Sequence, residues 1–174
     1  MDVNPEADVV KMKIALLKEQ HYPEVARIYR EGLETGIASF ETEVPDWNSW
    51  NDKFSPDCRL VAMKGKEIVG WCALSVVSKR AVYRGVAEVT IYIDSEHRGN
   101  GVGQRLLQAL VTASEEAGYW SLQAGNFPEN EASLKLHKKC GFRVVGIRER
   151  PAQRLGVWYD NVLLERRSKQ VGID

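Results

Sequence analysis

The segment that most constrains this chain is a predicted strand, a glycine-rich turn and a predicted helix in direct succession. β-Branched and aromatic residues are frequent at positions 86–93, and three glycines follow at 99, 101 and 103. Beyond the turn, apolar side chains recur at helical spacing as far as Gly118, a residue typical of a helix end. This succession places free backbone N–H groups at the positive end of a helix, so it predicts a binding site for phosphate or pyrophosphate.

The residues of the turn limit which kind of anion-binding turn it can be. Glycine suits such a turn because some positions need a positive φ and a bound phosphate needs the space of a Cβ. Arg98 adds a positive charge at the mouth. The spacing does not fit the G-x-G-x-x-G of dinucleotide-binding folds, and the Gly-Lys-Ser/Thr of a P-loop does not follow. A glycine-rich connection that binds nothing is the structural alternative that the spacing leaves open.

Length, charge and cysteine spacing limit the class of protein. A chain of 174 residues predicts one domain, expected at 11–168 after a loose tail at 1–10. Lys plus Arg and Asp plus Glu number 24 each, which argues against a nucleic-acid partner. The spacing of Cys58, Cys72 and Cys140 fits neither a disulfide framework nor a metal site, so we expect no metal. Without a signal segment or a run of about 20 apolar residues, the chain predicts a cytoplasmic protein with no membrane partner.

The order of the predicted elements indicates an α/β (mixed α+β) domain. That order is β-α-α-β-β-β-α-β-α-β-β, which predicts a central mixed, largely antiparallel sheet flanked by about four helices. Besides the segment above, we expect strands at 12–16, 59–63, 67–77, 119–124, 142–147 and 158–165. We expect three further helices: one at 20–34, one that begins at Asp46 and contains Trp47, Trp50 and Phe54, and one from Asn130 to Cys140. An arginine-rich loop is expected between the last two strands, and Trp47, Trp50 and Phe54 are expected to pack in the core rather than to bind a cofactor.

Two titratable residues lie where chemistry is possible. Alternation along 86–93 places Glu88 on one strand face with Thr90 and Tyr92. By itself this glutamate reads as solvent-facing; the functional interpretation is a general base, a role that partial burial would favour. His137 falls within the helix that ends at Cys140, and by itself it reads as an ordinary residue of a helix surface.

The motif Arg98-x-x-Gly101-x-Gly103 resembles the acetyl-CoA pyrophosphate loop of the GCN5-related N-acetyltransferases, whose fold the element order also matches. The stretch 136–142 is similar to the family's Leu-Tyr-Glu-Lys-x-Gly-Phe, with His137 in place of the tyrosine that commonly protonates the departing thiolate. Five stretches resemble the phosphinothricin acetyltransferase-like subgroup, which includes methionine sulfone and methionine sulfoximine acetyltransferases. They are 35–43, Tyr83 with Ala87 and Glu88, 98–103, 133–137 and 156–160.

The resemblance implies acetyl-CoA as co-substrate, a small amine acceptor and a homodimer, with the segment around Trp158 as a candidate contact. It implies catalytic roles for Glu88 and His137. For Asn130, helix capping is the alternative to a cofactor contact. The acetyl-CoA site implied by the resemblance comprises the backbone of Ile91, Tyr92 and Ile93, the loop of Arg98, Gly99, Asn100, Gly101, Val102 and Gly103, and the side chains of Asn130 and Lys139. The acceptor site would comprise Phe40, Lys79, Arg80 and Tyr83.

The implied reaction is direct attack of an amine on the thioester in a ternary complex. Glu88 would remove a proton from the α-ammonium group, a backbone N–H of 91–93 would stabilise the oxyanion, and His137 would assist the proton transfers or protonate the thiolate. Basic groups at Lys79, Arg80 and Arg154 would suit an acceptor with a carboxylate and a second oxo group. The alternatives are acetyl transfer to a polyamine, an aminoglycoside or a protein N-terminus, for which residues 78–84 are unsuitably basic, and a non-catalytic acyl-CoA sensor.

Overall fold

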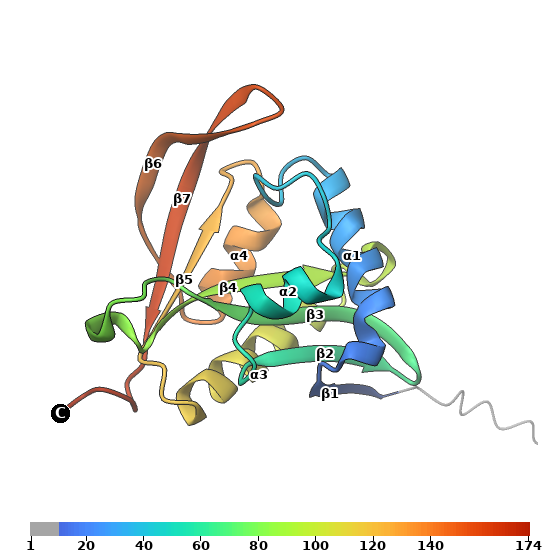
Figure 1. Cartoon of the computed structure of the whole chain (residues 1–174), viewed down its shortest axis with the longest axis horizontal. Coiled ribbons are helices and arrows are strands. Elements are labelled where there is room, and N and C mark those ends of the chain that lie inside the picture. Colours follow the sequence, from blue (N-terminus) through green and yellow to red (C-terminus); the bar gives the residue numbers. More distant parts are fainter. Residues whose placement is uncertain (1–10) are drawn as a thin grey trace, which may run out of the picture.

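The computed structural model describes residues 11–174 and contains one seven-stranded sheet with helices on both faces (Figure 1). The strand order is β1-β2-β3-β4-β5-β7-β6; β4 and β5 run parallel, and the other neighbours run antiparallel. The predicted α/β domain with a largely antiparallel sheet is therefore confirmed. The tail predicted for residues 1–10 lies outside the described residues.

The elements follow the predicted order. The strands are β1 (Met12–Leu16), β2 (Arg59–Lys64), β3 (Glu67–Val76), β4 (Val86–Ile93), β5 (Ser121–Asn126), β6 (Arg143–Arg154) and β7 (Val157–Arg167). The α-helices are α1 (Tyr22–Glu34), α2 (Trp47–Lys53), α3 (Val102–Glu116) and α4 (Glu131–Lys139), with short 3₁₀ turns η1 (Glu19–His21), η2 (Ala81–Tyr83) and η3 (Ser95–His97). None of these described helices has the length and hydropathy that crossing a membrane requires.

One face of the sheet is covered by α1 and α2, and its core is aromatic. The Trp50 and Trp71 rings meet edge to face at 5.5 Å, and the Trp71 ring stacks on Tyr92 at 5.4 Å. Asp46 caps α2 as expected, because its Oδ1 accepts a hydrogen bond from the Ser49 amide at 2.9 Å. The aromatic residues predicted to form core do so, and they bring α1 and α2 onto β3 and β4.

The opposite face is covered by α3 and α4, and its core is aliphatic. Leu106, Leu107 and Leu110 are fully buried at helical spacing along α3, against residues of β2 to β5 and β7. Gly118, at φ 88°, follows the C-cap of α3 and ends the helix as predicted.

The C-terminal hairpin is longer than its sequence indicates. The strands predicted at 142–147 and 158–165 are in fact 143–154 and 157–167, and the arginine-rich stretch between them is mostly paired strand. Two register shifts accommodate it, one of them between Arg148 and Ala152, where Arg150 adopts φ 42° and its amide donates to Asp160 Oδ1 at 2.9 Å. The bulge hides the alternation on which the strand prediction depended. In Figure 1 this hairpin extends beyond the layers of helices.

The pairing between β4 and β5 is short, and the two strands then separate. Val86–Glu88 pair with Ser121–Gln123, and the Trp120 and Ser121 amides donate to the Gly85 carbonyl at 2.8 and 3.1 Å. Farther on, β4 pairs with β3 and β5 with β7, but within residues 11–174 the two strands no longer pair with each other. We call this opening the fork, with its closed end at Glu88 and Gln123. Its inner edges leave backbone groups available to a ligand.

Candidate active site

The glycine turn lies between the end of β4 and the start of α3. Gly99 and Gly101 have φ values of 78° and 77°, and a Cβ built on either one meets nothing within 4 Å. Both therefore need glycine for their conformation, and both face open space. Gly103 serves another purpose, because it lies inside α3, where a Cβ would be only 3.1 Å from Leu136 of α4. The third glycine thus allows the two helices to pack closely.

The N-terminus of α3 differs from those of α2 and α4. Asp46 and Asn130 cap α2 and α4 through their side chains, whereas Gly101 at the N-cap of α3 has no side chain to offer. The first amides of α3 are thus left for an anion. Arg98 is exposed beside them, with its Nε donating to the Ile93 carbonyl at 3.3 Å. Open space, uncapped amides and a guanidinium fit a pyrophosphate.

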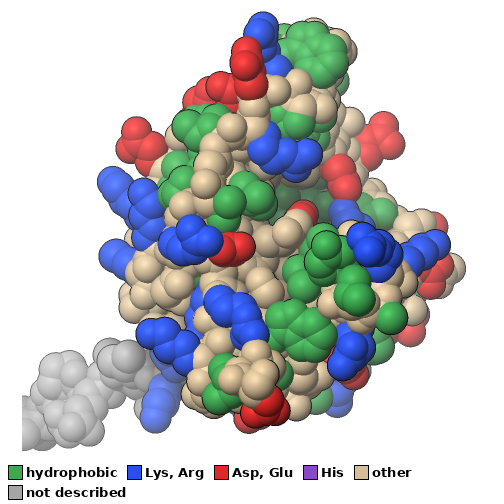
Figure 2. Space-filling view, turned by 90° about the vertical axis from the view of Figure 1, so that its left-hand side faces the viewer, with side chains coloured by type: hydrophobic (Ala, Val, Ile, Leu, Met, Phe, Trp, Pro, Cys, Tyr) green, Lys and Arg blue, Asp and Glu red, His purple; other side chains and the backbone are tan. Residues whose placement is uncertain are grey.

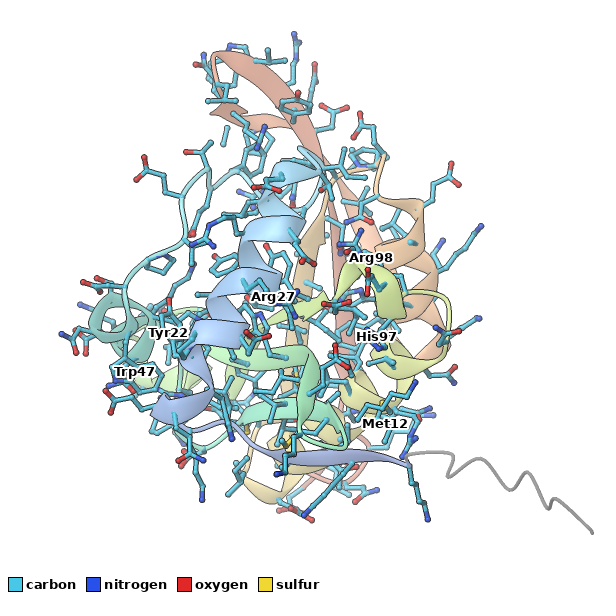
Figure 3. All side chains as sticks on the ribbon, turned by 90° about the vertical axis from the view of Figure 1, so that its right-hand side faces the viewer. Met12, Tyr22, Arg27, Trp47, His97 and Arg98 are labelled. Carbon is cyan, nitrogen blue, oxygen red and sulfur yellow. The ribbon has the colours of Figure 1, made fainter. Side chains whose placement is uncertain are left out.

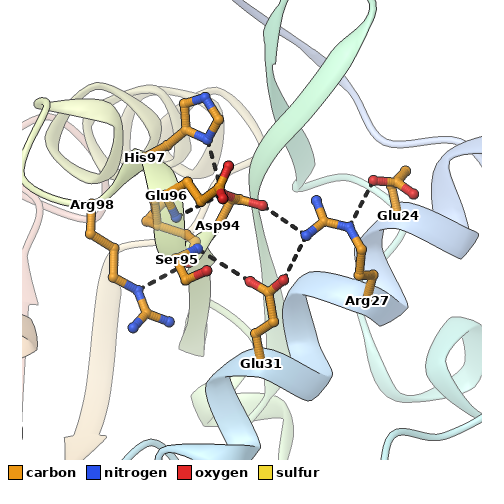
Figure 4. Close-up of polar contacts among 9 residues, drawn as sticks. Glu24, Arg27, Glu31, Asp94, Ser95, Glu96, His97 and Arg98 are labelled. Atoms are coloured by element: carbon orange, nitrogen blue, oxygen red, sulfur yellow. Dashed lines mark hydrogen bonds and ion pairs between the residues drawn. The ribbon is translucent and has the colours of Figure 1, made fainter.

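A buried carboxylate fixes the start of this turn against α1 (Figure 4). Asp94, only 4% exposed, accepts from Arg27 Nη1 at 2.8 Å and from the Glu96 amide at 2.9 Å. Its other partner is His97, with Nδ1 at 2.9 Å. Glu31 extends the contact, since it accepts from Arg27 at 2.7 Å and from the Ser95 amide at 3.2 Å. Figure 3 shows that Arg27 comes from α1, whereas His97 and Arg98 lie on the segment that follows β4.

Taken together, the hydrogen bonds and the ion pair of Asp94 affect its pKa more strongly than burial does. Burial by itself would raise the pKa of Asp94, but hydrogen bonds from His97, Arg27 and the Glu96 amide hold that pKa below its ordinary value. The carboxylate therefore remains charged and keeps the turn attached to the helix. The sequence does not indicate this network, because its members are distant in the chain.

Glu88 lies at the closed end of the fork, on the sheet face that also carries α1 and α2. Its side chain is exposed, so the partial burial that would favour a general base is not found in the unliganded chain. The Nε2 of Gln123 donates to Glu88 Oε2 at 3.1 Å. Within residues 11–174 no cation pairs with Glu88. The carboxylate is thus held by a neutral group at a position open to an incoming amine.

His137 is buried, which contradicts the interpretation of an ordinary helix-surface residue. Only 2% of it is exposed, and its ring meets Phe142 edge to face at 5.1 Å. The Ser133 carbonyl lies 2.8 Å from Nδ1, and since a carbonyl only accepts, Nδ1 carries the proton. Burial lowers the pKa of His137, partly offset by this hydrogen bond. The neutral ring therefore keeps a lone pair at Nε2, which has no partner among the described residues.

The two predicted catalytic residues lie on opposite faces of the sheet. Glu88 shares its strand face with Tyr92, which packs in the aromatic core, while its neighbours Ala87 and Val89 point into the aliphatic core. His137 is tied to the aliphatic side through Ser133, whose hydroxyl donates to Asn126 Oδ1 at 2.5 Å at the end of β5. No hydrogen bond joins Glu88 and His137 in the part of the chain that the structure describes, and the fork lies between the layers that carry them.

The residues expected to contact acetyl-CoA surround the fork. Asn130 caps α4 by accepting from the Ser133 amide at 3.2 Å, and its Nδ2 donates to the Ile37 carbonyl at 3.4 Å. The capping alternative is therefore observed, and a contact with pantetheine remains a prediction. Ile91, Tyr92 and Ile93 form the β4 arm of the fork, and Lys139 is exposed in the last turn of α4.

The predicted acceptor residues fall into two groups. Phe40 meets Phe127 edge to face at 4.7 Å, just beyond the end of β5 and so near the open end of the fork. Lys79, Arg80 and Tyr83 are exposed on the β3–β4 loop, next to the closed end, where the Arg80 guanidinium lies 5.3 Å from the Tyr83 ring. Among the described residues, no aromatic or cation–π contact joins Phe40 to the other three.

Three contacts around the acceptor side were not indicated by the sequence. Glu41 accepts from the Tyr29 hydroxyl at 2.9 Å and from Lys53 Nζ at 2.6 Å, so it ties the 37–45 loop to α1 and α2. Arg154 Nη2 donates to the Leu33 carbonyl at 3.0 Å and so caps α1 from the C-terminal hairpin. Gln123 beside Glu88 is the third. Alternation along β5 predicts that Gln123 and Leu122 point to different faces of the sheet. Only the strand order shows that Gln123 lies beside Glu88.

Comparison with known proteins agrees with this geometry. The model of the "Acetyltransferase (GNAT) family" matches residues 22–142, from α1 to just beyond α4. This chain belongs to that family. The acetyltransferase is 31% identical over 160 residues to a phosphinothricin N-acetyltransferase of Alcaligenes faecalis, with 88% of this chain and 81% of that protein covered. It is also 29% identical over 99 residues to an L-methionine sulfoximine/L-methionine sulfone acetyltransferase of Pseudomonas paraeruginosa, covering 57% and 58% of the two chains.

Solved structures show the same fold. A GNAT superfamily phosphinothricin acetyltransferase from Sinorhizobium meliloti, crystallised with acetyl-CoA, superposes with a TM-score of 0.84 at 24% identity. The match covers 94% of this chain and 91% of that one. With the family established, the protein is an acetyl-CoA-dependent N-acetyltransferase, and the fork and glycine turn are features that fit this co-substrate.

Proposed function

We propose that this acetyltransferase modifies the α-amino group of a small amino-acid-like acceptor of the phosphinothricin, methionine sulfone or methionine sulfoximine type. The position of Glu88 carries the proposal: a carboxylate that pairs with no cation among residues 11–174 lies at the closed end of a fork whose other face carries the glycine turn. The exposed basic residues Lys79 and Arg80 beside it suit an acceptor carboxylate and second oxo group better than a polycation. The names of the relatives point to the same acceptor class.

The residues around the fork would hold the co-substrate as follows. Backbone groups of Ile91, Tyr92 and Ile93 would pair with the pantetheine arm as a strand does, and one of their N–H groups would stabilise the oxyanion. The turn at 98–103 would take the pyrophosphate, with Asn130 near the arm and Lys139 near the phosphates. Acetyl-CoA itself supplies an activated thioester.

Proton transfers fall to residues on the two faces. Glu88 would take the proton of the acceptor ammonium group, directly or through water, which leaves a free amine to attack in a ternary complex. On the other face, neutral His137 in the tautomer that the Ser133 carbonyl requires can accept a proton at Nε2. Donating a proton to the coenzyme A thiolate would require the imidazolium form, which burial disfavours. We therefore favour an accepting or positioning role for His137.

We also propose that the enzyme is a homodimer of the cytoplasm. Figure 2 shows hydrophobic side chains among Lys and Arg side chains on the face that holds the β3–β4 loop and the C-terminal hairpin. Val82 and Trp158, exposed by 63% and 53%, belong to these two segments. Apolar exposure of this kind supports a protein contact. Cys58, Cys72 and Cys140 are all free and buried, in keeping with a reducing compartment.

Release of free thiol from acetyl-CoA tests the acceptor class. L-Phosphinothricin, methionine sulfone and spermine are compared as acceptors, each with the wild type and with Glu88→Ala. We expect turnover with the first two, little with spermine, and loss of turnover in the variant. Faster turnover with spermine would contradict the acceptor class. Acetyl-CoA binding without turnover of any amine would favour the sensor alternative.

A further inference from the structure

We infer that Gln123 is a positioning residue that orients the Glu88 carboxylate for proton transfer from the acceptor. This inference rests on the proposed function, because it requires Glu88 to be the general base. Gln123 belongs to none of the motifs in the sequence that resemble the family. Its role follows from where the strand order places it.

The backbone fixes the contact between the two side chains. Glu88 and Gln123 are register partners in the last paired row before the fork opens, so both project to the same face. Gln123 Nε2 donates to Glu88 Oε2 at 3.1 Å. This one bond engages one carboxylate oxygen and leaves Oε1 for the acceptor. Because both backbones are held in the sheet, only the side-chain torsions have to be ordered.

The neighbours in this row explain why a neutral amide is needed. Across the sheet the row reads Ser75, Glu88, Gln123, Glu165 and Arg143. Arg143 pairs with Glu165, so that cation is already engaged and does not neutralise Glu88. Gln123 also separates the two carboxylates of the row. Lys79, Arg80 and Arg84 are exposed on the β3–β4 loop, and none of them pairs with Glu88 within residues 11–174. Arg167, the register partner of Ser121, donates instead to the carbonyls of Trp120 and Val171.

A charged residue at position 123 would impair a base at Glu88. A lysine or arginine would pair with the carboxylate and weaken its affinity for a proton, while an aspartate or glutamate would repel it and compete for the ammonium group. An aliphatic residue would leave Glu88 free to rotate into several rotamers, and this lowers the fraction of molecules ready to react. A glutamine holds the carboxylate in place and adds no charge.

The test uses an isosteric variant without the amide, Gln123→Met. We expect kcat/KM for L-phosphinothricin to fall about tenfold, the lower end for loss of a hydrogen bond to a charged group, because the contact is exposed. The loss should appear in kcat, with the Kd for acetyl-CoA unchanged in calorimetry. Gln123→Glu should fall further and move the acidic limb of the kcat/KM profile to higher pH, since a second carboxylate disfavours ionisation of the first.

Ser75→Ala is the matched control. Ser75 is the register partner of Glu88 on its other side, in β3, and no hydrogen bond joins their side chains in the part of the chain described. This variant should keep wild-type kcat and pH profile. Thermal unfolding of each variant establishes that folding is intact, and a general loss of packing would lower the melting temperature without moving the pH profile.

A double-mutant cycle separates this inference from the proposed function. In Glu88→Gln, the further change Gln123→Met should have no effect on the residual rate, because its partner is already lost. Equal losses from Gln123→Met in both backgrounds would overturn the positioning role, as would wild-type kcat in the single variant. If Glu88→Gln keeps wild-type activity, Glu88 is not the base, and the proposed mechanism fails together with the role of Gln123.

Discussion

The two faces of the sheet differ in which polar groups they leave available to a ligand. The face of α1 and α2 is aromatic, α2 is capped by Asp46, and the loop before it is tied down by Glu41. On this face the Glu88 carboxylate pairs with no cation within residues 11–174. The face of α3 and α4 is aliphatic, and what remains available there is backbone, at the uncapped start of α3. If the proposed function is correct, we expect the acceptor and the co-substrate to approach the fork from opposite sides.

The largest expected effect is a loss of turnover caused by a change on the acceptor side alone. Glu88→Gln keeps the size of the side chain but removes the base, so kcat/KM should fall roughly 10²–10³-fold. The Kd for acetyl-CoA should stay within about twofold, because the proposed pyrophosphate site is at the uncapped start of α3, on the other face. Thiol release and calorimetry measure the two quantities. A parallel loss of acetyl-CoA affinity would contradict the division between faces.

The second prediction concerns a change on the co-substrate side alone, which should weaken the binding of acetyl-CoA. Gly101→Val should raise the Kd for acetyl-CoA on the order of 50-fold, as expected for the loss of about two hydrogen bonds to the pyrophosphate. Gly118→Val is the matched control at the other end of α3, since it has a similar φ of 88° and equally open surroundings. Both variants should lose about 1–2 kcal/mol of stability through strain. An unchanged Kd in Gly101→Val would remove the turn from the binding site.

The third prediction concerns the ion pair between Arg27 of α1 and Asp94, which attaches the glycine turn to that helix. Arg27→Met leaves buried Asp94 without its cation, and the free energy of unfolding at neutral pH should fall by about 2 kcal/mol. The depressed pKa of Asp94 means that its contribution is present above the ordinary carboxyl pKa and is lost as pH falls. The difference from wild type should therefore shrink below pH ~4. Arg30→Met, on the same helix but in no ion pair among the described residues, should change stability little.

The smallest expected effect tests the state of His137. A lowered pKa means that the unfolded chain binds a proton more readily than the folded one, so this residue reduces stability as pH falls below about 6.5. His137→Gln should flatten the slope of melting temperature against pH between roughly 7 and 5. His21→Gln serves as a comparison, since the pKa of His21 is also lowered but this histidine is more exposed. An unchanged slope in His137→Gln would show that the imidazole is not held neutral.

Much of the fold could be predicted because its signals are local. Asp46 and Gly118 mark helix boundaries by their own chemistry, and the spacing of Leu106, Leu107 and Leu110 fixes the buried side of α3. The C-terminal hairpin was underestimated because a bulge around Arg150 interrupts the alternation that identifies a strand. Nothing local indicates that a partner strand would still pair there.

The site was less predictable because its contacts join distant segments. The motif predicts the positive φ of Gly99 and Gly101, but the reason for Gly103 depends on Leu136 of another helix. The burial of His137 and the contact between Gln123 and Glu88 likewise follow from how the elements assemble. The sequence shows which side chains are capable of chemistry, whereas the packing of the strands and helices determines which of them are in contact.

The fork has a consequence for what can enter it. At the rim of a sheet, unpaired amides and carbonyls invite another polypeptide to add a strand, which leads to aggregation. Here the unpaired edges of β4 and β5 face each other between β3 and β7 instead of lying at the rim of the sheet. A slender chain with its own amide groups, as proposed for the pantetheine arm, would fit between two such edges, whereas a strand of a second protein would meet β3 or β7.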